Sequence, residues 1–310
     1  MNRLNALVVL PHIRIQHANM LSGPLSWGFP AMTAFLGTVH RLFRDGGFPV
    51  RLAGTGVICH EFVPQASRAP GSPLFALHLR RFPVNKDGSS ASMIEEGRAY
   101  LDITLVLGLE GELDEEAAGP RLAVAMRERL QAMSVAGGSV QPYWKQPLWL
   151  FLPDAFSEQA AVFRRLRYRL LPGFALAERR DKLLQHVAAL RAARPEASEL
   201  DALLDLCRIN MDVEQDPEDP QRGLWSARPK GGWFVPVPVG FRAISPLYPP
   251  GSVRNARDQE TPFRFVESLY TLGEWQSPHR LSCPQDLLWH YRADEEAGLY
   301  LCTQFQGDRA

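Results

Sequence analysis

Apolar and polar residues alternate along the first segment of the chain, and this pattern predicts a β-strand over residues 5–16. The alternation separates two groups of side chains, one on each face: Leu7, Val9, Ile13 and Ile15 against His12, Arg14 and Gln16. The predicted strand therefore has one apolar face and one wet, partly basic face.

Helical spacing replaces the alternation after a loop that is rich in glycine, proline and aromatic residues. Apolar residues from Met32 to Phe43 recur at intervals of three and four, and Gly46 and Gly47 end the run. Residues 55–63 and 98–108 are then predicted to be strands. Between them, residues 64–97 contain a possible strand at 74–81 and a polar turn at 85–90, so we predict an inserted, protruding β-arm.

A second helix is predicted over residues 114–134. The turn Gly137–Ser139 leads into residues 139–152, in which the apolar run Trp149–Leu152 predicts a buried strand. The order of elements is strand–helix–strand, arm, strand–helix–strand. This order is typical of the ferredoxin-like, RRM-like pattern on which RNA-recognition modules are built. We therefore predict an α+β fold in which residues 1–152 form such a core, with a β-hairpin thumb inserted at 64–97.

The remainder of the chain is predicted to be helical at first and irregular later. Helices are expected at 156–171, 179–193 and 198–209, the last with Ser198 as N-cap, and an acidic, proline-bearing linker at 212–222. Residues 231–247 are interrupted by Pro236 and Pro238 and predict an edge strand or an irregular segment. Residues 153–222 thus form a helical segment with a linker, and 223–310 a strand and loop region that packs on the core.

Composition excludes several classes of protein. No run of ~18 apolar residues predicts a membrane span, and the four cysteines form no CxxC pair, which indicates reduced thiols in the cytoplasm and no zinc ribbon. The 34 basic and 34 acidic residues balance, but only four of the basic residues are lysines. Arginine binds phosphate through two donors and stacks on bases, so this bias suits RNA, although a preference for arginine codons explains it equally well. No cofactor or metal site is predicted.

The chain carries none of the common catalytic motifs, including GxSxG, GxxxxGK[ST], HExxH and GxGxxG. His40, one turn before Arg44, is the best candidate for a general acid or base in an RNA-cleaving enzyme. The alternative is a half-buried histidine at the rim of the core.

Two segments favour RNA contact without catalysis. Glycines in the Gly137–Ser139 turn allow backbone N–H groups to approach a phosphate, although a plain helix-ending turn has the same residues. Residues 254–280 combine arginines, amides and Trp275, a mixture that suits single-stranded RNA, with surface arginines around a structural aromatic as the alternative.

Blocks of sequence along nearly the whole chain resemble the second Csy subunit of type I-F CRISPR systems, a Cas5-type RAMP subfamily. Two of them are GPLSWGFP at residues 23–30 and LGEWQSPHRL at residues 272–281. The others, in order, are Ile15–Asn19, Phe35–His40, Asn85–Ser89, Glu95–Ala99, Ala136–Ser139, Leu170–Ala175, Leu200–Asn210 and Val253–Asp258.

The resemblance implies a non-catalytic subunit of a Cascade-type surveillance complex that binds the 5′ handle of the CRISPR RNA (crRNA). Its expected partners are the large subunit, the adjacent backbone subunit and, indirectly, target DNA near the short motif beside the target. The predicted RNA-binding residues are Arg14, Gln16, Trp27, Phe29, Arg80, Arg81, Lys86, Gly137, Gly138, Ser139, Arg254, Asn255, Arg257, Trp275, Ser277, His279 and Arg280. A crRNA-processing endonuclease of the same fold and a purely structural adaptor remain the alternatives.

Overall fold

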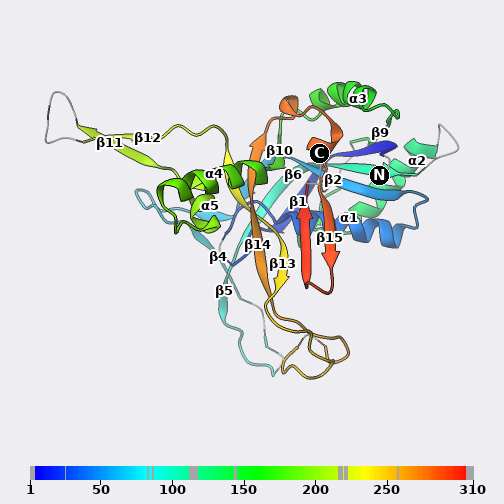
Figure 1. Cartoon of the computed structure of the whole chain (residues 1–310). Helices are drawn as coiled ribbons and strands as arrows, with labels where there is room; N and C mark the ends of the chain where they lie inside the picture. The colour runs from blue at the N-terminus through cyan, green and yellow to red at the C-terminus, as the bar shows by residue number, and fades with distance from the viewer. Residues whose placement is uncertain are drawn as a thin grey trace.

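One large antiparallel sheet runs through the molecule (Figure 1). The computed structural model describes residues 4–24, 26–81, 84–85, 87–111, 118–142, 145–215, 219, 223–256 and 258–304. Within these residues eleven strands form the sheet in the order β15–β16–β13–β14–β10–β2–β6–β1–β8–β7, with β9 also paired to β1. Five α-helices accompany it in the described part of the chain. The predicted α+β class is confirmed.

Three long strands make the middle of the sheet: β1 (Ala6–Asn19), β6 (Arg98–Glu110) and β2 (Arg51–Pro64). β6 lies between the other two and is buried on both faces over most of its length. β1 contains two β-bulges, where its register with β6 shifts between Leu10 and Ile13 and between Ile15 and Ala18. A bulge adds one residue to one strand and so changes which face the following side chains occupy.

The first bulge corrects the predicted faces of β1. Leu7 and Val9 pack with helix α3 (Phe156–Arg169), whereas Ile13 and Ile15 pack on the opposite face, in the cluster that contains residues of α1 (Met32–Gly46) and α2 (Ala118–Gln131). The prediction that all four point one way was wrong, because strict alternation assumes an unbroken register. Arg14 and Gln16 are exposed on the α3 side, so the predicted wet face exists beyond the bulge.

Helix α1 ends as predicted, at Gly47 in the left-handed conformation with φ of 61°. The elements β1–α1–β2 and β6–α2 follow the predicted order, and the ferredoxin-like assignment of this region stays a prediction. After α2 come β7 (Ser134–Val135), β8 (Gly138–Val140) and β9 (Leu148–Phe151). β8 and β9 pair with the side of β1 that faces away from β6, and β7 pairs with β8. The run Trp149–Leu152 forms a strand for most of its length, as predicted, but the strand is not buried: three side chains of β9 are half-buried and Phe151 is exposed.

The inserted arm forms a small sheet of its own, separate from the large one. It contains β3 (Ala66–Ser67), β4 (Ala76–Arg81) and β5 (Met93–Glu96), and it extends from the lower end of the sheet in Figure 1. The insertion between β2 and β6 is thus a β-structure, as expected. Its assignment as a thumb stays a prediction.

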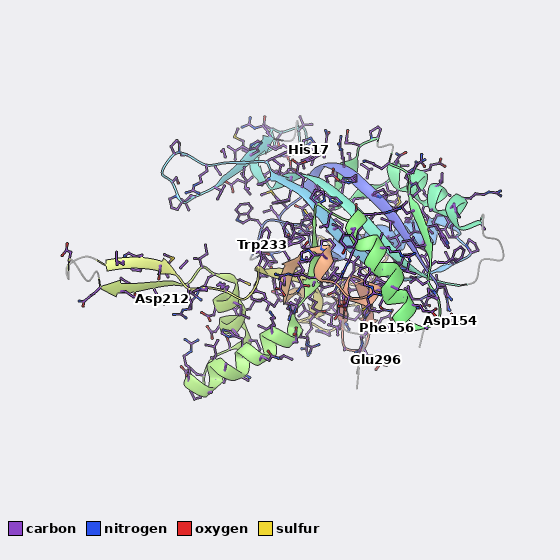
Figure 2. All side chains as sticks on the ribbon, turned by 90° about the horizontal axis from the view of Figure 1, so that it is seen from above. His17, Asp154, Phe156, Asp212, Trp233 and Glu296 are labelled. Atoms are coloured by element: carbon purple, nitrogen blue, oxygen red, sulfur yellow. The ribbon has the colours of Figure 1, made fainter. Side chains whose placement is uncertain are left out.

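The helices α3, α4 (Arg180–Ala193) and α5 (Glu199–Cys207) lie close to their predicted ranges, and Ser198 caps α5 in a capping box with Asp201. The unpredicted strand β10 (Phe174–Glu178) enters the sheet between β14 and β2. The expected linker at 212–222 is in part a hairpin of β11 (Met211–Gln215) and β12 (Gly223–Ala227), which projects from the body in Figures 1 and 2.

The C-terminal strands complete the sheet and its core: β13 (Phe234–Ala243), β14 (Val266–Gln276), β15 (His290–Asp294) and β16 (Leu299–Thr303). β13 lies between β14 and β16, so its assignment as an edge strand is corrected, although β16 pairs only with residues 240–242, beyond Pro236 and Pro238. Two short 3₁₀ turns, Pro278–Arg280 and Pro284–Asp286, precede Trp289, whose indole is fully buried and donates to Leu176 O at 2.9 Å. None of the described helices is long and apolar enough to cross a membrane.

Candidate nucleic-acid interface

Helix α3 packs on one face of the central sheet but covers only part of it. We call the uncovered, polar part of this face the wet half of the sheet. Leu7, Val9 and Val106 lie under α3 in one apolar cluster. Further along β1, the same side carries the exposed residues Arg14 and Gln16. The neighbouring strand β6 contributes Asp102, whose carboxylate lies 3.8 Å from Arg14 Nε. The sheet thus changes along its strands from an apolar to a polar surface.

Two histidines that the sequence reasoning did not select lie on this surface. The rings of His12 and His60 stack with centroids 4.2 Å apart and an interplanar angle of 20°. His12 Nδ1 lies 3.1 Å from the Asp102 carboxylate, and its backbone N–H donates to Thr104 Oγ1. His60 contacts Thr104 Oγ1 at 2.7 Å and Pro172 O at 2.6 Å through its two ring nitrogens. His12 lies on β1 and His60 on β2, so the two side chains meet over β6, which lies between these strands.

Burial controls the ionisation of the neighbouring groups. It lowers the pKa of His60, and the nearby His12 ring lowers it further, against the opposing effects of the Pro172 carbonyl and Asp102. Burial also raises the pKa of Cys59 to about 12, with the Asp102 and Glu61 carboxylates acting in the same direction. At neutral pH His60 is therefore neutral, and the thiol of Cys59 stays protonated and weakly nucleophilic.

The Gly137–Ser139 turn lies at the edge of the sheet beside the second half of β1. Ala136 and Gly137 both have positive φ, at 50° and 72°, and they connect β7 to β8. Ser139 pairs directly with Gln16, so three predicted residues, Gly138, Ser139 and Gln16, are brought together. A hollow of about 330 Å³ between this turn and the start of α1 is lined by Gly137, Ala31 and Thr33.

Helix α1 begins at this hollow with Ala31 as N-cap, without a side-chain cap and without an acidic residue in its first turn. The first N–H groups of a helix attract anions when no carboxylate competes for them. The turn and the helix start together form a small recess at the end of β1, which Asn19 and Ala136 also line.

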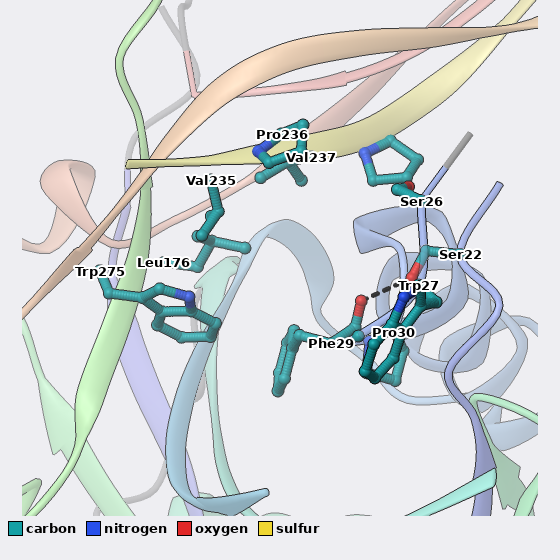
Figure 3. Close-up of a pocket in the computed structure, with 12 residues that line it drawn as sticks. Ser22, Ser26, Trp27, Phe29, Pro30, Leu176, Val235, Pro236, Val237 and Trp275 are labelled. Carbon is teal, nitrogen blue, oxygen red and sulfur yellow. Dashed lines mark hydrogen bonds between the residues drawn. The ribbon is translucent and has the colours of Figure 1, made fainter. Parts of the chain in front are cut away.

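The predicted aromatic residues lie on the opposite face of the sheet from Arg14. Phe29 and Trp275 meet edge to face at 4.9 Å between ring centroids and pack with the cluster around α1. They line a cavity of about 170 Å³ with Trp27, in which Ser22 Oγ donates to Phe29 O at 2.6 Å (Figure 3). Trp27 is exposed and lies 5.5 Å from the ring of Phe75, near the arm. The structure does not place these rings with Arg14 and Gln16.

The arm and the loop between β13 and β14 hold the next group of predicted residues. Arg80 and Arg81 are exposed on β4, and Arg80 pairs with Glu96 of β5 at 3.1 Å. Arg254 and Asn255 lie on an exposed turn, where Asn255 has a φ of 60°. Lys86 and Arg257 lie outside the described residues.

The remaining predicted residues, Ser277, His279 and Arg280, lie on the α3 side of the sheet. Ser277 Oγ and His279 Nδ1 are 2.7 Å apart, and His279 and Arg280 are exposed. Arg167 of α3 holds this turn by donating to the carbonyl oxygens of His279 and Leu281. Ser277, His279 and Arg280 therefore share a side of the sheet with Arg14 and Gln16.

The geometry separates His40 from this surface. His40 is exposed on α1, which covers the opposite face, and its ring lies 5.1 Å from that of Tyr291. The sequence offered one signal for His12, its place in the alternation beside Arg14, and none for its pairing with His60. In the described part of the chain no group of three or more His, Cys, Asp or Glu side chains could hold a metal ion.

Comparisons with known proteins give one consistent result. The model of the family "CRISPR-associated protein (Cas_Csy2)" matches residues 8–302. The CRISPR-associated protein Csy2 of Pseudomonas aeruginosa (strain UCBPP-PA14) is 45% identical over 307 residues, which cover 95% of this chain and 94% of that protein.

Proposed function

Because the chain belongs to the Csy2 family of CRISPR-associated proteins, and is thus a subunit of a type I-F Csy complex, we propose that it holds the 5′ handle of the crRNA without cutting it. The proposed RNA path begins on the wet half of the central sheet at Arg14 and Gln16. It continues past the Gly137–Ser139 turn and around the end of β1 toward Trp27 and the arm.

The observation that carries this proposal is the pairing of Gln16 with Ser139, which joins the Gly137–Ser139 turn to the strand that carries the exposed Arg14. Single-stranded RNA needs phosphate donors spaced along its backbone and flat side chains on which unpaired bases stack. The edge of β1 supplies the donors, and Trp27 with its neighbour Phe75 supplies exposed rings further along the path.

The arrangement of histidines favours holding over cleavage. Metal-free RNA cleavage needs a base and an acid on opposite sides of the scissile phosphorus atom. The His12 and His60 rings are stacked on each other, and both ring nitrogens of His60 already contact protein groups. His40, the candidate of the endonuclease alternative, lies on the other face of the sheet. Incubation of the purified chain with precursor repeat RNA is expected to yield no specific cleavage product.

The proposed partners are the large subunit, the adjacent backbone subunit and, indirectly, target DNA near its recognition motif, in a complex that acts in the cytoplasm. Large apolar residues are exposed on α4, α5 and the β11–β12 hairpin, including Leu184, Leu200 and Trp225. Exposed apolar side chains in such numbers are typical of surfaces that other proteins cover.

The test is the salt dependence of handle binding. The full chain, co-purified with the large subunit, is titrated against a labelled RNA of the handle sequence. Arg14→Ala is compared with Arg41→Ala, a matched control on α1, because the two side chains are 62% and 61% exposed and both lie near a carboxylate. If Arg14 contacts a phosphate, its loss makes the slope of log affinity against log salt shallower by ~0.7.

Arg41→Ala is expected to leave the slope of the wild-type chain unchanged. Equal slopes for both variants would remove the wet half of the sheet from the RNA path. A chain that binds the large subunit but shows no affinity for the handle RNA would favour the structural adaptor instead.

A further inference from the structure

Two β-bulges bring His12 and His60 together on the wet half of the sheet. His12 occupies the first bulge of β1 with a φ of 54°, a conformation that costs free energy for a residue other than glycine. His60 occupies a bulge of β2, where the register with β6 shifts between Cys59 and Glu61. Little burial offsets this cost, because the His12 side chain is still 34% exposed. Strained residues that the core does not need are typical of functional sites.

The hydrogen bonds fix both rings in place. Pro172 O can only accept, so His60 carries its proton on Nδ1 and accepts from the Thr104 hydroxyl through Nε2. Thr104 Oγ1 in turn accepts from the backbone N–H of His12. The Asp102 carboxylate binds Nδ1 of His12, and the second nitrogen of this ring, Nε2, takes part in none of these bonds. A fixed, neutral His60 therefore supports the more exposed ring of His12.

We propose that the His12–His60 stack is a subsite for one unpaired base of the bound RNA, which lies against the His12 ring. This inference rests on the proposed function and identifies where a single nucleotide is held within it. Arg14 lies beside the same carboxylate as His12, so its guanidinium is placed to meet the phosphate of that nucleotide.

The chemistry favours a base over the other groups of RNA. The Asp102 carboxylate next to the ring repels a phosphate placed directly on the stack, whereas the flat face of a base carries no charge. Bases in a duplex already stack on both sides, but a splayed single-stranded base has a free face for an aromatic ring. Two preformed, parallel rings lose little conformational freedom when the base adds to them.

The experiment is an abasic scan of the handle RNA. Each oligonucleotide of the series lacks one base, and its affinity for the full chain co-purified with the large subunit is measured for four proteins: wild type, His12→Ala, His12→Phe and His186→Ala. His186 is the matched control, because it also pairs with an aspartate, Asp205 at 2.8 Å, but lies on α4. Thermal unfolding of each protein shows whether it is folded.

For the wild type, removal of the base that occupies the subsite is expected to lower affinity roughly 5- to 150-fold, the range measured for base–aromatic stacking. With His12→Ala this loss should nearly vanish at that one position and persist at the others. His12→Phe, which keeps an aromatic ring, should restore it, and His186→Ala should keep the wild-type profile.

Identical abasic profiles for wild type and His12→Ala would overturn the subsite, and they would leave the proposed function intact as long as the wild type binds the complete handle. Failure of the wild type to bind the complete handle would instead refute the proposed function. If His12→Ala does not fold, the abasic profiles of His12→Phe and His60→Gln are compared instead, because only His60→Gln removes the supporting ring. A smaller loss of affinity at the subsite position with His60→Gln than with His12→Phe would support the subsite, and equal profiles would overturn it.

Discussion

A methyl group at position 138 is expected to separate β8 from β1. A Cβ atom built on Gly138 lies 2.6 Å from Gln16 O and from Ile15 Cγ2, and 2.8 Å from Ala18 N. Two of these three atoms belong to the backbone of β1, so no side-chain rotation relieves the contacts. β8 must move, which removes the ladder contacts of Ile15 with Val140 and of Gln16 with Ser139. At about 0.5–1.5 kcal/mol for each backbone hydrogen bond, Gly138→Ala should lower the free energy of unfolding by roughly 1–3 kcal/mol.

The control is the same substitution at Gly37 in helix α1, where a Cβ atom meets nothing within 4 Å. Gly37→Ala should raise the free energy of unfolding by about 1 kcal/mol, because alanine is the better helix former. Urea denaturation of the full chain measures both changes. Handle affinity should fall for Gly138→Ala only, since its turn supports the proposed RNA path. Equal urea midpoints for wild type and Gly138→Ala would refute the reasoning.

Three further predictions concern stability and are measured by urea denaturation. Trp289→Phe leaves the buried carbonyl of Leu176 without its indole donor, so the free energy of unfolding should fall by about 1–3 kcal/mol; an unchanged value would mean that water replaces the donor. Ser198→Ala removes the capping box with Asp201 and should cost about 1 kcal/mol, whereas Ser198→Asp, which keeps an N-cap acceptor, should cost less. Burial lowers the pKa of His60 in the folded chain, so the unfolded chain takes up a proton first as the pH falls, and the free energy of unfolding should decrease below about pH 6.5. His60→Gln should make this pH dependence shallower, by at most ~1.4 kcal/mol per pH unit. Equal pH dependences for wild type and variant would contradict the prediction.

Local sequence signals predicted the elements that depend on local chemistry. The helix that ends at Gly47 and the helix capped by Ser198 were both predicted, because helical periodicity and capping residues act within a few positions. The four-residue strand β9 shows the limit of this approach. Its apolar run was read as buried, but burial depends on whether a further strand pairs beyond it, and the run itself carries no such information.

The faces of β1 and the position of β10 required knowledge of the tertiary structure. Histidines occupy both bulges of β1, where a glycine would have given a signal, so the change of face after Leu10 could not be seen in the alternation. β10 has five residues and lies between two helices, and it is a strand because β2 and β14 pair with it on either side.

The candidate site was predictable in its residue types and only in part in its arrangement. Gln16 and the Gly137–Ser139 turn were both selected from the sequence, and their pairing joins them. Phe29 and Trp275 were also selected, but they lie on the other face, because aromatic composition does not reveal which side of a sheet a ring occupies. The His12–His60 stack was missed, since two bulges on different strands create it.

Trp289 is synthesised long after the strand β2 that it contacts. Its backbone bridges to Thr55 of β2, and just before it Leu287 lies over Gly56 of the same strand. A nascent chain exposes this stretch of β2 on the ribosome until residues 287–289 have left the exit tunnel. Translation that stalls before Leu287 would release a polypeptide with a bare apolar strand, a substrate for chaperones and proteases.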